Sequence, residues 1–175
     1  MKRFFLKSVL FSIILTIFVF ICGCNDNTIN SASTIYDANT INGTITFVDT
    51  NLVLDTTYGY YNVSAFANWL PTANATASSR IYPTKVNGKY TANYKIIIPS
   101  DGSYTLTSAY IKIPYIVGSS VLGLGMYDMT QGNDTTHNLS IIYGQHAKAV
   151  ISGRTGIGNI NFNSWLDTTK KIYTF

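Results

Sequence analysis

The residues that could perform acid–base or metal chemistry in this chain are few. His137 and His146 are its two histidines, and they flank a run at 138–143 that we expect to form a strand. Asp128 and Asp134 both lie shortly before His137, and imidazole together with carboxylate suits zinc. The spacing matches no known ligand pattern, so we expect loop histidines and no metal centre.

Other catalytic and ion-binding patterns are incomplete. A Ser-His-Asp triad is recognised by geometry, so residue inventory leaves it open, but the chain has no GxSxG elbow. The run at 128–134 places two carboxylates and an asparagine around Gly132, without the alternating spacing of a calcium loop. Gly153, Gly156 and Gly158 lack the GK[ST] of a phosphate loop. We therefore expect no enzyme and no cofactor.

Charge composition narrows the function classes further. All eight acidic residues are aspartate, which excludes sites built on glutamate, such as the HExxH zinc helix and the bidentate ligand of an EF-hand. The formal net charge of +4 includes Lys2, Arg3 and Lys7, and without them nine basic residues face eight acids. Nucleic-acid binding needs a concentrated basic face, so we expect no nucleic-acid partner.

Aromatic residues make up 14% of the chain, with thirteen tyrosines. Flat amphipathic rings stack on sugar faces, so an exposed row would form a glycan-binding platform. Tyr58, Tyr60 and Tyr61 lie close together, and Trp69 and Trp165 each border a polar stretch. Tyrosine and tryptophan also fill the cores of β-sandwiches. Trp69 and Trp165 are the candidate ligand contacts, with polysaccharide as the candidate ligand.

The first 21 residues have the composition of a secretory signal. Residues 1–7 carry three positive charges, and residues 8–21 form an almost unbroken apolar run. These are the two leading regions of a signal peptide. A transmembrane anchor is the competing interpretation, since an anchor needs about 20 apolar residues.

The end of the apolar run favours a lipoprotein signal. Ile21-Cys22-Gly23-Cys24 resembles the bacterial lipobox, in which an aliphatic residue at −3 and a small residue at −1 precede an invariant cysteine. The resemblance implies a signal peptide at 1–23, cleavage after Gly23 and a lipid on Cys24. A Cys-x-Cys metal or redox pair is the alternative, but such pairs normally need partners elsewhere. We expect anchoring in the cell envelope, with the outer membrane of a diderm bacterium favoured and the leaflet left open.

The remaining chain divides into a tether and one domain. Residues 24–41 contain the lipidated cysteine and short polar side chains typical of a flexible tether. Residues 42–175 contain β-branched and aromatic runs separated by turn residues, which indicates strands. The runs that we expect to form strands are 42–48, 60–69, 89–98, 103–113, 120–127, 138–143, 148–151, 157–162 and 171–175.

These strands predict an all-β domain. Residues 99–102 (PSDG) form a tight turn, so 103–113 should return antiparallel to 89–98 as a hairpin. Residues 71–80 and 130–136 are predicted as long loops. About seven to nine short strands in this length predict a single antiparallel β-sandwich of the immunoglobulin-like or transthyretin-like class.

Four segments carry a family resemblance. The segments are 43–47 (GTITF), 61–67 (YNVSAFA), 88–90 (GKY) and 102–106 (GSYTL). Their order resembles the carboxypeptidase regulatory-like domains, which are transthyretin-like sandwiches of bacterial envelope proteins, over residues 42–127. The resemblance implies a non-catalytic module with a structural or accessory binding role, in contact with polysaccharide or envelope proteins. A carbohydrate-binding surface module that uses exposed Trp and Tyr is the alternative.

Overall fold

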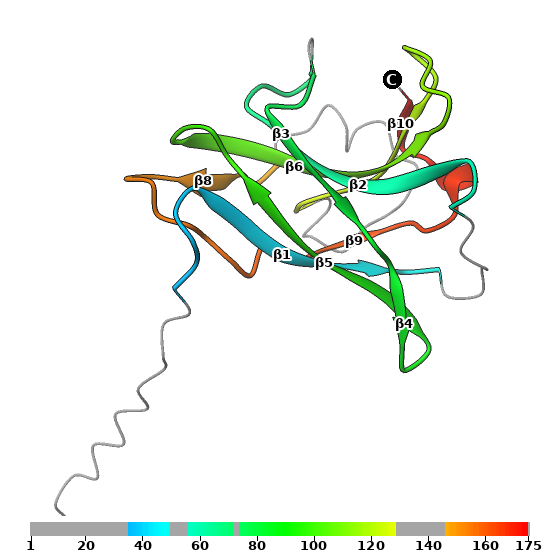
Figure 1. Cartoon of the computed structure of the whole chain (residues 1–175), viewed down its shortest axis with the longest axis horizontal. Helices are drawn as coiled ribbons and strands as arrows, with labels where there is room; N and C mark the ends of the chain where they lie inside the picture. The colour runs from blue at the N-terminus through cyan, green and yellow to red at the C-terminus, as the bar shows by residue number, and fades with distance from the viewer. Residues whose placement is uncertain (1–34, 50–55, 72–73, 129–145, 175) are drawn as a thin grey trace, which may run out of the picture. The chain divides into compact units, whose positions relative to one another are not determined.

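The computed structural model describes residues 35–49, 56–71, 74–128 and 146–174, and these belong to one compact unit, Ile35–Phe175. The described residues are almost entirely β (Figure 1). The strands are β1 (Thr40–Phe47), β2 (Gly59–Phe66), β3 (Ala77–Ile81), β4 (Thr84–Val86), β5 (Lys89–Ile97), β6 (Gly102–Lys112), β7 (Val121–Met126), β8 (Ala149–Ile151), β9 (Phe162–Ser164) and β10 (Tyr173–Thr174). A short 3₁₀ helix, η1 (Thr168–Lys170), lies between β9 and β10.

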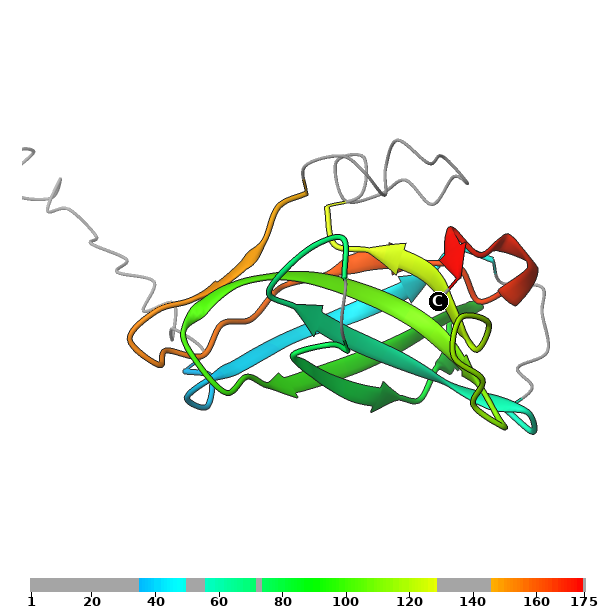
Figure 2. The same ribbon diagram turned by 90° about the horizontal axis from the view of Figure 1, so that it is seen from above.

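The strands form two sheets. One has the order β4-β5-β1-β9, and the other has the order β10-β7-β6-β2-β3, with β8 paired to β6. The views in Figures 1 and 2 show the two sheets stacked face to face. The prediction of an all-β sandwich is therefore confirmed. One pair departs from the antiparallel pattern, because β1 and β9 run parallel.

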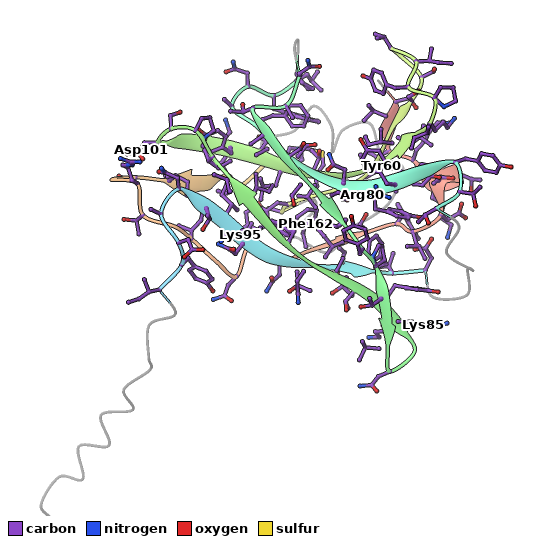
Figure 3. The ribbon with its side chains drawn as sticks, viewed as in Figure 1. Tyr60, Arg80, Lys85, Lys95, Asp101 and Phe162 are labelled. Carbon is purple, nitrogen blue, oxygen red and sulfur yellow. The ribbon has the colours of Figure 1, made fainter. Side chains whose placement is uncertain are left out.

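Alternating side chains explain why the two sheets pack together. In β5 the side chains of Ala92, Tyr94 and Ile96 are buried, while the residues between them face outward. The opposing β2 contributes Val63 and Ala65, both fully buried. Each large apolar side chain that is buried this way contributes about 1.5–3 kcal/mol. Figure 3 shows the buried side chains filling the space between the sheets.

The end of β9 and the residue after it close one edge of the sandwich. Ser164 accepts a hydrogen bond from the Val48 N–H at 3.1 Å, and the Trp165 N–H donates to the Leu124 carbonyl at 3.0 Å. The first bond reaches the end of β1, and the second reaches β7 in the other sheet. Ser108 Oγ also donates to Ser164 Oγ at 2.7 Å, and both residues are buried. The C-terminal segment is thus bonded to both layers.

The predicted hairpin at 99–102 is wrong, although the turn exists. β5 pairs with β1 and β4, whereas β6 pairs with β2, β7 and β8. The turn therefore carries the chain from one sheet to the other, and the Tyr104 hydroxyl donates to the Ser100 carbonyl at 2.8 Å across it. Both flanking strands bury one face. The same burial pattern is expected for a hairpin within one sheet and for an arch, a turn that connects two sheets.

Four other differences from the predicted elements appear in the structure. The predicted loop at 71–80 contains most of β3, and β4 was not predicted. The predicted strand at 60–69 ends at Phe66, and Ala67 is exposed. The run 157–162 joins a ladder only through the bridge between Ile157 and Ile41, and β9 begins at Phe162. The predicted strand at 138–143 and loop at 130–136 lie outside the described residues.

The folded unit begins before residue 42. The Asn39 N–H donates to the Arg154 carbonyl at 2.9 Å, and the Asn39 carbonyl accepts from the Ile98 N–H at 2.8 Å. Lys95 forms an ion pair with Asp37. Residues 35–41, predicted as part of the tether, therefore belong to the sandwich. Cys24 and the predicted signal peptide lie outside the described residues, and within those residues no helix has the length and apolar character to cross a membrane.

Candidate functional site

The outer face of the six-stranded sheet carries an arginine between two tyrosines. Asn62 of β2 lies directly opposite Arg80 of β3, so the side chain of Tyr60 lies diagonally across from Arg80 on the same face. Tyr82 follows two residues after Arg80 and is 68% exposed. The intervening Ile81 points the other way and is buried in the core.

The guanidinium group of Arg80 contacts both rings. Its central carbon lies 4.8 Å from the ring centroid of Tyr60 and 5.3 Å from that of Tyr82, which are cation–π distances. Arg80 is exposed, and within the described part of the chain no carboxylate lies within ion-pairing distance of it. The cluster of Tyr60, Arg80 and Tyr82, the Tyr-Arg-Tyr cluster, therefore presents a positive charge that no described acid neutralises.

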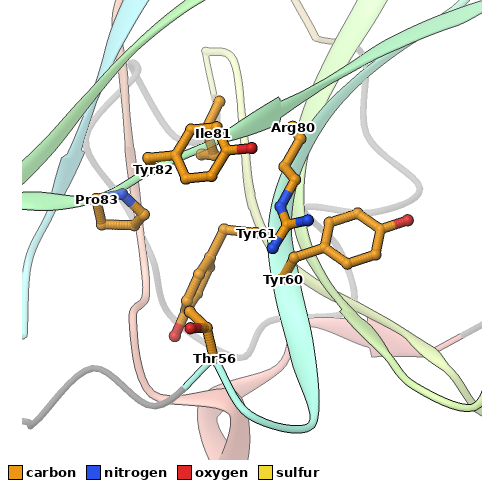
Figure 4. Close-up of a pocket in the computed structure, with 7 residues that line it drawn as sticks. All are labelled: Thr56, Tyr60, Tyr61, Arg80, Ile81, Tyr82 and Pro83. Carbon is orange, nitrogen blue, oxygen red and sulfur yellow. The ribbon is translucent and has the colours of Figure 1, made fainter.

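A pocket of about 180 Å³ opens at this cluster (Figure 4). Its lining residues are Thr56, Tyr60, Tyr61, Arg80, Ile81, Tyr82 and Pro83. Figure 4 shows the guanidinium group directed toward the middle of the labelled side chains. Sites that enclose drug-sized ligands have volumes of about 300–1,000 Å³. This pocket is smaller, so it suits one small group that combines an apolar face with a negative charge.

Tyr61 forms the inner wall of the pocket and has a structural role. Its hydroxyl donates to the Leu166 carbonyl at 2.7 Å, and its ring packs edge-on against Phe47 and Tyr110. Burial raises the pKa of Tyr61 well above its ordinary value, with smaller contributions from Tyr110 and nearby aspartates. The phenol is therefore neutral at physiological pH and fixed in place.

The two predicted ligand contacts, Trp69 and Trp165, do not line this pocket. Both are partly buried and pack against the small cluster formed by Met126 and Ile172. The ring of Trp69 lies edge-on to Phe66 at 5.6 Å, and the Lys170 ammonium lies 4.2 Å from the centre of the Trp165 ring. Their role as ligand contacts stays a prediction.

The structure describes two of the four residues considered for a metal site, His146 and Asp128. His137 and Asp134 lie outside the described residues. The Nε2 atom of His146 is buried and has no hydrogen-bond partner among them. Asp128 accepts a hydrogen bond from the Ala147 N–H at 3.1 Å. Across the described ranges, no group of three or more His, Cys, Asp or Glu could hold a metal ion.

Every aspartate in the described residues is engaged within the chain. Asp49 accepts from two successive backbone N–H groups, both at 2.6 Å, and Asp101 accepts from two others at 2.6 and 2.9 Å. Asp37 pairs with Lys95, which holds the pKa of that carboxyl below its usual range. The full set is Asp37, Asp49, Asp101, Asp128 and Asp167. These carboxylates hold loops and turns together.

The sequence pointed to part of the Tyr-Arg-Tyr cluster. Tyr60 belongs to the tyrosine group singled out from the sequence, whereas Arg80 lies in the predicted loop 71–80 and Tyr82 lies just after it. In the run Ala77–Ile81 and the two residues after it (ASSRIYP), a β-branched and an aromatic residue, Ile81 and Tyr82, follow small and polar residues. That pattern, ended by a proline, was the available signal for a strand.

The chain matches no known protein-family model, no curated protein and no solved structure. The resemblances to the lipobox and to carboxypeptidase regulatory-like domains therefore stay predictions.

Proposed function

We propose that this chain is a lipid-anchored cell-envelope protein whose β-sandwich is a non-catalytic module with an accessory binding role. The observation that carries the binding role is the pocket at the Tyr-Arg-Tyr cluster, where a positive charge lies between two aromatic rings. The lipobox-like end of the apolar run supports the anchor. The resemblance to envelope sandwiches agrees with both parts of the proposal.

The lining of the pocket supports a binding role without catalysis. General acid–base catalysis needs a group that exchanges protons near neutral pH, most often histidine or a tuned carboxylate. Among the described residues that line the pocket there is no histidine and no carboxylate. The described aspartates, which could supply a carboxylate, are held by backbone N–H groups, by Thr169 or by Lys95. Such a site holds its ligand and leaves it unchanged.

The anchor would place this module at a membrane surface. A single acyl chain gives only marginal membrane binding, whereas two or three chains anchor stably, since each buried CH₂ contributes about 0.8 kcal/mol. We propose the outer membrane of a diderm bacterium as the location. The partners would be polysaccharide or other envelope proteins, and the Tyr-Arg-Tyr cluster would contact them.

The anchor is tested by labelling the full chain with radioactive palmitate in a diderm bacterium. We expect a labelled protein in the membrane fraction, and loss of the label in Cys24→Ser. Cys22→Ser is the control, because that residue would leave with the signal peptide. Labelling that persists in Cys24→Ser would refute the lipid anchor.

The binding role is tested by co-sedimentation of the full chain, in detergent, with isolated envelope polysaccharide. We expect the wild-type chain to sediment and Arg80→Gln to remain in the supernatant. Lys85→Gln is the matched control, because it removes the same charge from beside another ring, that of Tyr90 at 5.3 Å. Equal sedimentation of Arg80→Gln and the wild type would show that the pocket does not bind the polysaccharide.

A carbohydrate-binding surface module is the second candidate function. It is favoured by exposed tyrosines, since Tyr82, which lines the pocket, is 68% exposed and Tyr58, two residues before the lining residue Tyr60, is 71% exposed. Sugar faces stack on such rings. A thermal-shift screen against neutral oligosaccharides tests this role, and Trp69→Ala and Trp165→Ala test the two predicted contacts. A saturating glycan at a hundred times its Kd should stabilise the fold by about 2.7 kcal/mol.

A further inference from the structure

The charge in the pocket indicates what its ligand must carry. Arg80 is exposed and contacts two rings, and none of the described carboxylates pairs with it. Contact with a ring does not use the N–H donors of a guanidinium group, which fit a carboxylate in a two-bond geometry. An anionic group in the ligand would accept hydrogen bonds from these N–H groups. A neutral ligand would offer these donors only uncharged acceptors, whose hydrogen bonds are weaker.

The walls of the pocket limit the rest of the ligand. The rings of Tyr60 and Tyr82, together with Pro83, provide flat apolar surface, and Thr56 provides a hydroxyl. A bare inorganic anion would use the charge and leave the rings without a contact. A sugar ring has an apolar face for an aromatic surface and hydroxyls for a polar neighbour. The volume of about 180 Å³ suits a single small ring.

We propose that the pocket binds one uronic acid residue of an acidic polysaccharide. Its carboxylate would bind the guanidinium group of Arg80, and its apolar face would lie against Tyr82 or Tyr60. Thr56 would contact a ring hydroxyl. This inference rests on the proposed accessory binding role and narrows it to one class of sugar.

Saturation-transfer difference NMR on the full chain in detergent tests the inference. The probes are two pairs of free sugars: glucuronate with glucose, and galacturonate with galactose. Within each pair the sugars differ by a carboxylate in place of a hydroxymethyl group, so the comparison isolates the charge. We expect at least one acidic sugar to bind about tenfold more tightly than its neutral counterpart, since charge-assisted hydrogen bonds are the stronger ones.

Substitutions then locate the binding. Arg80→Gln should remove the preference for the acidic sugar, and Arg80→Lys should restore part of it, because lysine keeps the charge without the paired donors. Tyr82→Ala should weaken binding to acidic and neutral sugars alike, and Tyr82 is exposed enough to be removed without opening the core. Lys85→Gln should behave as the wild type.

The outcomes separate this inference from the function on which it rests. If neutral sugars bind as tightly as acidic ones, or if Arg80→Gln keeps the preference, the uronic acid proposal is wrong while the carbohydrate-binding role survives. If inorganic phosphate displaces the acidic sugar at equal concentration, the site is a general anion site and the proposal is wrong. If no sugar binds while the chain still sediments with envelope polysaccharide in an Arg80-dependent way, the accessory role survives without this ligand.

Discussion

Tyrosine serves two purposes in this molecule. Inside the sandwich, Tyr61, Tyr94 and Tyr104 are buried, and their hydroxyls donate to backbone carbonyls at 2.7, 2.5 and 2.8 Å. A buried tyrosine needs such a partner, because an unpaired hydroxyl would cost about 1–3 kcal/mol. Tyr58 and Tyr82 lie at the surface, where their rings are available to a ligand. The same residue type therefore supports the fold and lines the candidate site.

The buried tyrosines predict a loss of stability at high pH. Burial raises the pKa values of Tyr61 and Tyr94 far above the ordinary value of 10.0. Above about pH 10 the unfolded chain releases these protons and the folded chain keeps them, so the free energy of unfolding falls as pH rises. The slope approaches about 1.4 kcal/mol per pH unit for each tyrosine. Urea unfolding at about pH 9 and about pH 11 measures it.

Two phenylalanine variants provide the control for the pH dependence. Tyr61→Phe and Tyr94→Phe keep the rings and remove the ionisable hydroxyls, so each should reduce the fall in stability between the two pH values. Both should also be less stable than the wild type at about pH 9, because the Leu166 and Ile160 carbonyls lose their donors. An unchanged pH dependence in both variants would contradict the assignment.

At the level of elements, aspartates accept hydrogen bonds from backbone N–H groups that lie outside the strand ladders. Asp49 follows β1 and accepts hydrogen bonds from the N–H groups of Leu166 and Asp167, which follow β9. Asp101, in the turn before β6, accepts from Gly153 and Arg154 after β8. Each carboxylate joins segments that are more than 50 residues apart in sequence. These two acidic residues therefore have a structural role in the connections between strands.

Asp49→Asn should destabilise the sandwich by about 2 kcal/mol. An amide has one acceptor oxygen, so one of the two N–H groups loses its partner, and hydrogen bonds to charged groups contribute about 1.5–3 kcal/mol each. Asp37→Asn is the control, because its partner Lys95 and its own side chain are both well exposed and such pairs contribute little. Urea denaturation of both variants measures the difference. Equal stability of Asp49→Asn and the wild type would show that these bonds do not hold the edge.

Local patterns predicted the elements better than their pairing. Residues 42–48 and 89–98 alternate clearly, and β1 and β5 form within one or two residues of those bounds. The pairing of β5 and β6 could not be deduced, because the choice between a hairpin and an arch depends on the distant strands β1 and β2. β3 was missed for a related reason: Ser78 and Arg80 are exposed at the sheet edge, and their polar side chains resemble a loop.

The candidate site, like the strand pairing, could be predicted from the sequence only in part. Tyr60 could be recognised from sequence because aromatic residues cluster around it. Arg80 could not, because nothing in the sequence states that it lies across from Asn62. Trp69 and Trp165 have the composition of ligand contacts, yet both are partly buried. Exposure depends on packing between distant segments, and composition does not determine it.

At the level of the whole unit, the C-terminal segment is part of the core. Phe162 is 3% exposed and lies edge-on to Tyr94 at 6.1 Å and to Tyr127 at 6.4 Å. Leu166 is buried in the same core, and Ile172 packs on Met126. The family resemblance covers residues 42–127 and stops before Phe162, Leu166 and Ile172. β1 would become an exposed strand edge without β9, and the core would lose its wall on that side.

Truncation of the chain after residue 128 should therefore prevent cooperative folding. The remaining strands would expose β1 and the inner face of β7, and the free energy of unfolding of a domain is only about 5–15 kcal/mol. Phe162→Ala gives a graded version of the same test, with an expected loss of about 3–5 kcal/mol from the cavity. Val150→Ala, at a side chain that is 53% exposed in the same part of the chain, should change stability little. Thermal unfolding followed by circular dichroism compares the three, and a cooperative transition in the truncated chain would show that residues 42–127 fold as a sandwich without the C-terminal segment.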